Sequence, residues 1–336
     1  MCGILGIAVN EMNTEVLKTL YDVFSAQANR GVEGGGISIN NKDLYRFRSV
    51  SPYRIFSIYN FSVWKKIKVG DRVLFHHRRP TSSPNLPKHN HPIANNSGTM
   101  HLIHNGVIWN ADTLYNELKT EFTFETEGTD KLRKCFTDSE VMVHLIDKYM
   151  KKGQDIVTAI KNMYEKVSGS YAIAINIKDD ENIYLFSHSN PINISKDKFG
   201  NFYFSSEHHK STDTEFVCEL SEGEIGKLNR FGYEQLDKIT QEPFQSKITN
   251  YGYGFNNSYD RFPYCEERII ETVNLGDKVE RFIKKTRNEI KKQSNDISYS
   301  KLCLHIFSAI DKEFPNLDIE NDGIRKAVRE VLDKKF

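Results

Sequence analysis

A cysteine at position 2, followed directly by an apolar segment, constrains this 336-residue chain more than any other feature of its sequence. Gly3 adds no side-chain bulk, and the apolar residues between 4 and 9 predict a short buried strand. If Met1 is removed, Cys2 carries a thiol and a free α-amine whose reference pKa near ~8 suits a base. Such a residue can activate its own nucleophile, provided that a sheet holds the chain end still. The alternative is that Cys2 is a small apolar residue at a frayed terminus.

Length and composition narrow the class of protein. The chain is long enough for one large domain or two smaller ones, and its net charge of +1 does not favour nucleic acid or a membrane surface. The five cysteines are far apart and form no CxxC pair, which argues against a disulfide framework and for a reducing compartment. No apolar run reaches about 18 residues and no secretory signal is present, so we expect a cytoplasmic protein without membrane segments.

Hydrophobic periodicity predicts the order of the elements. Helices are predicted from residues 13 or 14 to about 29, 111–119, from 138 onwards and 156–167. Strands are predicted at 4–9, from 73 into a loop that reaches 81, and at 100–103, 171–175, 183–187, 202–205 and 223–229. Residues 121–136 are polar and indicate an exposed loop. Residues 241–264 read as a linker, and three amphipathic segments within 279–332 predict a helical tail.

Several polar motifs allow both a structural and a functional interpretation. Thr137-Asp138-Ser139-Glu140 matches a capping box, in which Asp138 would simply favour the helix dipole. Asn105-Gly106 is typical of a β-turn, but an amide side chain beside a glycine N–H is also the donor pair that an oxyanion hole needs. The glycine-rich segment after Arg30 does not have P-loop spacing, so close backbone packing or a substrate-lined turn is favoured over a phosphate cradle.

Histidines cluster in the segment between residues 76 and 104. They are His76, His77, His89, His91, His101 and His104. Zinc sites need defined spacing and often a carboxylate or cysteine ligand, so hydrogen-bonding roles are favoured over a metal site. We expect neither a metal nor a cofactor.

The ordered set of motifs resembles the glutaminase domain of class II glutamine amidotransferases, which are N-terminal-nucleophile hydrolases. The resemblance rests on the following segments: Cys2-Gly3-Ile4, Arg30-Gly31, His77-Arg78, His91-Pro92, His104 to Ile108, Asp138-Ser139-Glu140, Gly169 to Ala172 and Glu222 to Ile225. It covers roughly residues 2 to 235 and implies an α+β fold, a four-layer αββα sandwich of two antiparallel sheets between helices.

The resemblance also implies roles for individual residues. Cys2 is the nucleophile, Asn105 and the Gly106 N–H hold the oxyanion, and Arg30 orders the nucleophile end. The residues implied to bind the substrate are Arg78 and Thr81 for its α-carboxylate, Asp138 for its α-ammonium, and Gly31 and His91 around it. Arg79 directly follows Arg78, so the sequence leaves open which arginine binds the carboxylate, because neighbours on a strand face opposite sides.

The resemblance predicts two parts of the chain and one leading function. Residues 2–238 would form the amidotransferase domain, and residues 239–336 a linker with a helical extension. We expect hydrolysis of L-glutamine through a Cys2 thioester, with ammonia passed to a separate synthase, because residues 239–336 contain no motif of a known acceptor domain. An amidohydrolase for another amide and a non-catalytic interaction protein remain alternatives; direct binding of nucleic acid is not expected.

Overall fold

The computed structural model describes residues 2–47, 64, 66–80, 86–130, 133–210, 212–240 and 276–293, with single positions at 306, 309, 310, 313, 314, 328 and 331. The chain divides into two units, Met1–Tyr251 and Gly252–Phe336, and each is described by itself. Within the described residues, no helix has the length and apolar character needed to cross a bilayer.

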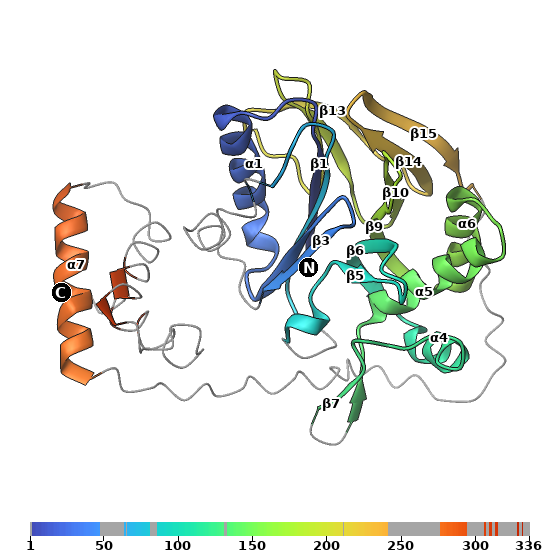
Figure 1. Cartoon of the computed structure of the whole chain (residues 1–336), viewed down its shortest axis with the longest axis horizontal. Coiled ribbons are helices and arrows are strands. Elements are labelled where there is room, and N and C mark those ends of the chain that lie inside the picture. The colour runs from blue at the N-terminus through green and yellow to red at the C-terminus, as the bar shows by residue number, and fades with distance from the viewer. Residues whose placement is uncertain are drawn as a thin grey trace, which may run out of the picture. The chain divides into compact units, whose positions relative to one another are not determined.

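Two large antiparallel sheets form the centre of the first unit (Figure 1). The seven-stranded sheet has the order β13 (Glu215–Glu219), β11 (Asn193–Lys196), β12 (Phe202–Ser205), β1 (Gly3–Ala8), β4 (Arg72–Arg78), β2 (Gly34–Ile39) and β3 (Asp43–Phe47). The six-stranded sheet has the order β15 (Gly232–Lys238), β14 (Glu224–Asn229), β10 (Ile183–His188), β9 (Gly169–Ile177), β6 (Met100–Ile108) and β5 (Ile93–Ala94). The predicted strand at the N-terminus is therefore a central strand of its sheet, where both edges are paired.

Helices cover the outer faces of both sheets (Figure 1). Helix α1 (Thr14–Ala26), which runs into the 3-10 turn η1 (Gln27–Arg30), lies on the seven-stranded sheet, and Asn13 caps it as predicted by accepting from the Val16 N–H. Helices α4 (Ala111–Leu118), α5 (Asp138–Lys151) and α6 (Ile156–Lys166) lie on the six-stranded sheet. The predicted four-layer αββα sandwich is confirmed.

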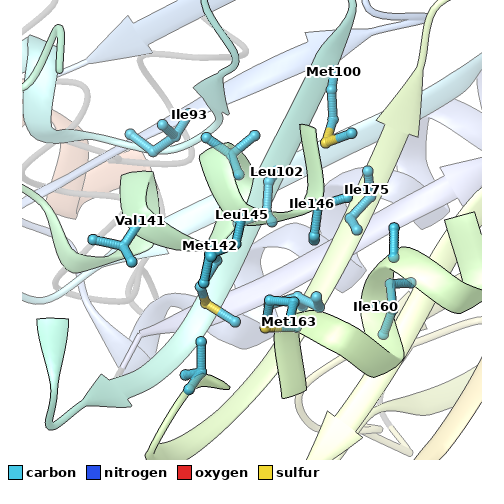
Figure 2. Packing of buried hydrophobic residues seen from close by; sticks show 14 of the residues in the cluster. Ile93, Met100, Leu102, Val141, Met142, Leu145, Ile146, Ile160, Met163 and Ile175 are labelled. Atoms are coloured by element: carbon cyan, nitrogen blue, oxygen red, sulfur yellow. The ribbon is translucent and has the colours of Figure 1, made fainter. Parts of the chain in front are cut away.

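Strand alternation divides the buried apolar residues into three clusters, one between each pair of layers. In β1, Ile4 and Ala8 face the second sheet, whereas Leu5 and Ile7 face α1. The third cluster packs α4, α5 and α6 against β6 and β9. Figure 2 shows part of it, with Met142 and Ile146 of α5, Ile160 and Met163 of α6 and Ile175 of β9 among its members. Alternate side chains on these strands therefore face different layers, and the same alternation fixes which layer each polar side chain faces.

Two predictions about the segment before and at the start of α5 were wrong. Helix α5 begins at Asp138 as expected, but the Thr137 side chain makes no capping bond, and Glu140 does not reach back to it. Glu140 instead accepts from the backbone N–H groups of Glu125 and Thr126, at 2.6 and 3.1 Å. The described part of residues 121–136 is accordingly not an exposed loop.

Aromatic burial explains why this segment is fixed. Phe122 and Phe124 are buried against His144 of α5. A short hairpin, β7 (Gly128–Asp130) and β8 (Arg133–Cys135), follows. The segment is polar overall, so its composition gave no sign that Phe122 and Phe124 are buried.

The second unit contains helix α7 (Gly276–Gln293), as predicted. On this helix Val279 and Ile283 are buried, and the Phe282 ring lies 5.3 Å from that of Phe314. The other two predicted amphipathic segments are described only at single positions, of which Ile306, Ile310, Val328 and Val331 are buried. The predicted linker at 241–264 lies outside the described residues.

Candidate active site

Strand register brings three of the predicted site residues toward the space between the sheets. Gly3 pairs with His77, so Cys2 lies at the end of β1 next to Arg78 at the end of β4. By alternation, Cys2 and Arg78 share the face of Ile4 and Leu74, which pack against the second sheet. Asn105 of β6 shares the face of Ile103, which packs in the same cluster from the opposite side.

The Cys2 thiol is held by the backbone of Arg79. The Arg79 N–H donates to Sγ at 3.5 Å, and Sγ lies 3.6 Å from the Arg79 carbonyl oxygen. Burial raises the pKa of the thiol, against the opposing effects of the Arg79 backbone and the Arg78 charge. The thiol is therefore protonated at neutral pH, and a base is needed to activate it.

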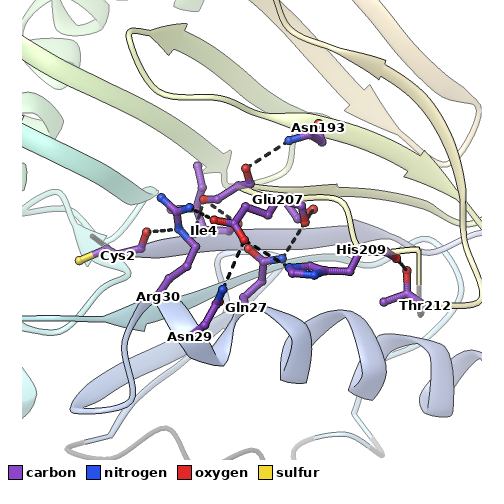
Figure 3. A network of polar contacts seen from close by, with 11 residues as sticks. Cys2, Ile4, Gln27, Asn29, Arg30, Asn193, Glu207, His209 and Thr212 are labelled. Atoms are coloured by element: carbon purple, nitrogen blue, oxygen red, sulfur yellow. Dashed lines mark hydrogen bonds and ion pairs between the residues drawn. The ribbon is translucent and has the colours of Figure 1, made fainter.

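Arg30 and Gly31 hold the backbone around the thiol. The Arg30 Nε donates to the Cys2 carbonyl oxygen at 2.9 Å, and its guanidinium pairs with Glu207 (Figure 3). A Cβ on Gly31 would lie 2.5 Å from the Arg78 carbonyl carbon and oxygen, so only glycine fits there. Close packing is thus the physical role of this Arg-Gly pair.

The two adjacent arginines have different environments. Arg78 is buried, its Nη1 donates to Asn90 Oδ1 at 2.9 Å, and burial lowers its pKa while Cys2 and Asp138 oppose that shift. Arg79 is exposed and contributes its backbone to the thiol. Arg78 is therefore the arginine whose side chain lies in the site, and Thr81 lies outside the described residues.

Asn105 and Gly106 lie inside β6, where they pair with Ala172 and Tyr171, so the β-turn interpretation was wrong. The Asn105 side chain is fully buried, and within the described part of the chain neither its amide nitrogen nor its oxygen has a hydrogen-bond partner. Gly106 has φ +145°, and a Cβ there would lie 1.9 Å from the Ser170 carbonyl oxygen. A buried amide without a partner is costly, and a bound ligand would satisfy it.

Asp138 links α5 to the end of β6. One carboxylate oxygen accepts from the Ile108 N–H at 3.1 Å, and the other accepts from the Ser139 N–H at 2.9 Å. Its charge acts on Cys2, Arg78 and His104. The thiol, the guanidinium and this carboxylate therefore form one electrostatic group, although 136 positions separate the first from the last.

The next residue, Ser139, lies behind the site among histidines that burial keeps neutral. Its hydroxyl lies 2.6 Å from His91 Nε2 and 2.8 Å from His104 Nδ1, and His76 Nε2 donates to the His104 carbonyl at 3.1 Å. Burial lowers the pKa of His76, His91 and His104. The predicted site residue His91 is thus packed against α5 and fixes the strand that carries Asn105.

The remaining histidines of the cluster also make hydrogen bonds. His77 donates to the Gly31 carbonyl, His89 to the Thr126 carbonyl, and His101 lies 2.7 Å from Ser38 Oγ. Among the described residues, no group of three or more His, Cys, Asp or Glu side chains has a metal-binding arrangement. Hydrogen bonding, the favoured interpretation of these histidines, accounts for the contacts that they make.

Sequence reasoning missed three residues of the site: Asn90, Ser139 and Glu207. Asn90 contacts Arg78, Ser139 contacts two histidines, and Glu207 contacts Arg30. The capping-box interpretation concealed Ser139, whose position beside Asp138 was the available signal. Nothing local marks Glu207, which is 177 positions from Arg30.

Comparison with known proteins finds relatives of this chain. Residues 77–213 match the glutamine amidotransferase domain family. The chain is 28% identical over 230 residues to a glutamine–fructose-6-phosphate aminotransferase (isomerizing) of Sulfolobus acidocaldarius, covering 67% of this chain and 37% of the relative. It is 29% identical over 234 residues to an amidophosphoribosyltransferase of Methanocaldococcus jannaschii, covering 67% of this chain and 46% of the relative.

A solved structure shares the fold. The structure of glutamine phosphoribosylpyrophosphate amidotransferase from B. subtilis aligns with a TM-score of 0.54 at 21% identity, covering 71% of this chain and 50% of that one. The chain spans less than half the length of the two curated relatives described above. The residues that match the family, 77–213, lie within the unit Met1–Tyr251.

Proposed function

The chain contains a class II glutamine amidotransferase domain, and from this premise we propose that it hydrolyses the side-chain amide of L-glutamine with Cys2 as the nucleophile. One observation carries the proposal: buried Arg78 lies next to Cys2 at the ends of paired strands, where its charge acts together with that of Asp138. Free glutamine is a zwitterion, so its binding site needs a cation and an anion close to the nucleophile. Arg78 and Asp138 supply these two charges.

Removal of Met1 creates the base. The α-amine of Cys2 takes the thiol proton as Sγ attacks the amide carbon, and it later gives that proton to the leaving ammonia. A thioester remains on Cys2, and water hydrolyses it to release glutamate. The raised thiol pKa supports this route, because a protonated nucleophile requires a base within reach.

Asn105 and Gly106 stabilise the tetrahedral intermediate. The amide nitrogen of Asn105 has no partner within the described residues, so it is available to the developing oxyanion. The Gly106 N–H is the second donor that the family resemblance implies. Donors that are fixed in a buried site need no rearrangement when the charge develops.

The other predicted residues shape this site. Arg30 orients the Cys2 carbonyl, Gly31 allows the close approach of the Arg78 backbone, and His91 holds the β6 strand through Ser139. Asp138 is assigned to the substrate ammonium, although it also accepts two backbone N–H bonds. Thr81 follows Arg78 closely in the sequence and is proposed to complete the carboxylate site.

The ammonia is proposed to pass to a separate synthase that docks on the C-terminal helices. The two relatives described above are named a glutamine–fructose-6-phosphate aminotransferase and an amidophosphoribosyltransferase. This chain covers 37% and 46% of their lengths. Helix α7 supports a docking role because its polar side is rich in lysine and arginine.

Glutamine hydrolysis by the purified protein tests the proposal. Wild-type protein without Met1, as verified by intact mass, is expected to release equal amounts of glutamate and ammonia, and Cys2→Ala is expected to release neither. Circular dichroism checks that the variant is folded. Full activity in Cys2→Ala would rule out the nucleophile, and hydrolysis of other acyl amides without hydrolysis of glutamine would favour a different amidohydrolase.

A further inference from the structure

The segment directly after β12 holds the first residues of β1. Ser206 Oγ accepts from the Ile4 N–H at 3.0 Å, and the Ser206 N–H donates to the Ile4 carbonyl at 2.9 Å. Ser206 is fully buried. The next residue, Glu207, therefore stands at a fixed position relative to the chain end that carries Cys2.

Glu207 is the centre of a polar network around η1 (Figure 3). One carboxylate oxygen pairs with the Arg30 guanidinium, and the other lies 3.5 Å from Asn29 Nδ2 and 3.4 Å from His209 Nε2. The Glu207 backbone carbonyl accepts from Gln27 Nε2 at 2.7 Å. Side chain and backbone of one residue thus fix three residues of the same short turn.

Arg30 connects this network to the nucleophile. Its side chain is 6% exposed, against 37% for Glu207, and its Nε donates to the Cys2 carbonyl while its Nη1 pairs with Glu207. The bond to the carbonyl fixes the plane of the Cys2–Gly3 peptide and with it the Cys2 Cα. Only ψ and χ1 of Cys2 then remain to place the amine and the thiol.

We propose that Glu207 is a positioning residue for the nucleophile, acting through Arg30 on the Cys2 backbone. The proposal rests on the proposed glutaminase function. Its physical reason is that a buried guanidinium needs a counter-charge, and Glu207 supplies one on the side of Arg30 that faces away from Cys2. Without that carboxylate, the geometry of Arg30 and the local field at Cys2 both change.

The ionisation of Glu207 agrees with this role. Partial burial raises the pKa of its carboxyl group, but the hydrogen bond and charge of Arg30 outweigh that effect and leave the pKa below its ordinary value. Glu207 is therefore an anion throughout the neutral range. The charged side chains that act most strongly on the Cys2 thiol are Arg78 and Asp138, and neither is changed by substitution at Glu207.

The first test compares Glu207→Gln with a matched control, Glu215→Gln. Glu215 is 73% exposed and pairs with Lys196 on the surface, so the control is expected to have wild-type kinetics. Glu207→Gln is expected to lower kcat for glutamine by about 10- to 100-fold, since small displacements of a reacting group have effects of this size. KM should change by no more than about twofold, because Arg78 and Asp138 still bind the substrate.

A second readout is independent of glutamine hydrolysis. The rate of Cys2 alkylation by iodoacetamide is followed against pH by mass spectrometry of the N-terminal peptide. The charge of Arg30, no longer balanced by Glu207, favours the thiolate, so the midpoint of the alkylation profile should fall in Glu207→Gln and stay unchanged in Glu215→Gln. If the wild-type protein hydrolyses no glutamine, the proposed function fails, and this profile still decides the role of Glu207.

A double-mutant cycle tests whether Glu207 acts through Arg30. In an Arg30→Gln background, which has no positive charge at this position, Glu207→Gln is expected to have little further effect on the alkylation profile. Multiplicative effects in the double mutant would overturn the proposal, as would a Glu207→Gln protein indistinguishable from Glu215→Gln. If Glu207→Gln does not fold, the same double-mutant cycle is measured with Glu207→Asp. Independent effects of Glu207→Asp and the Arg30 substitution would then overturn the proposal.

Discussion

Acid should destabilise the protein through His77, because burial favours its neutral ring. His77 is fully buried on β4, its ring centroid lies 4.2 Å from that of Phe24, and its Nδ1 donates to the Gly31 carbonyl at 3.2 Å. Within the described residues its Nε2 has no hydrogen-bond partner. Burial lowers the pKa of His77 from 6.5 to about 4, although hydrogen bonding to the backbones of Gly31 and Phe24 opposes that shift.

The sign and size of the effect follow from proton linkage. Below pH 6.5 the unfolded chain binds a proton at this position, whereas the folded protein does not until the pH approaches 4. The stability that neutral His77 contributes is thus complete above pH 6.5 and is lost as the pH falls toward 4. At pH 5 the loss is about 2 kcal/mol, from roughly 1.4 kcal/mol for each pH unit below 6.5.

Urea unfolding at pH 7 and pH 5 measures this loss. Trp64 is buried and stacks on Phe75 of β4, so its fluorescence reports on the sheet that holds His77, and Trp109→Phe removes the exposed second tryptophan. His77→Asn keeps a donor near Nδ1 but cannot be protonated. His77→Asn is made in the Trp109→Phe protein, which serves as its parent. Between pH 7 and pH 5 the parent should lose about 2 kcal/mol more of its free energy of unfolding than the His77→Asn variant loses.

The other buried histidines contribute equally to both proteins, so the difference isolates His77. If His77→Asn and its parent lose the same free energy between pH 7 and pH 5, the reasoning about this ring is refuted.

Three further predictions address the site and its support. Asn105→Ala should lower kcat about 10²- to 10³-fold with little change in KM, and an effect confined to KM would contradict an oxyanion role. Arg78→Lys should raise KM for glutamine by more than tenfold, since a lysine loses about 1.5–3 kcal/mol of charge-assisted bidentate contact. Arg79→Lys should leave KM nearly unchanged, because Arg79 contributes its backbone. Steady-state kinetics compare the two variants. Glu140→Gln should lower the free energy of unfolding by about 2 kcal/mol, measured by urea titration, because an amide cannot accept all the bonds that this buried carboxylate accepts; an unchanged value would contradict its role in fixing residues 125–126.

Local patterns in the sequence predicted most of the elements that carry the site. Alternation and apolar runs marked β1, β4 and β6, and helical spacing marked α1 and α5, because these signals depend only on neighbouring residues. The order of the motifs was sufficient to suggest the family and the αββα fold. Polar composition misled where a few buried aromatics decided the outcome, as in residues 121–136.

What the sequence by itself determined is the set of reactive groups: a cysteine after Met1, an Asn-Gly pair, an arginine pair and an acidic helix start. Only the tertiary structure decided how they meet. The register that sets Gly3 against His77 places Arg78 beside Cys2 and leaves Arg79 exposed, and the Asn-Gly pair became part of a strand because β9 lies beside it. Glu207 reaches Arg30 only because β12 pairs with β1. Pairing between distant strands follows from the packing of whole layers, and no local periodicity encodes it.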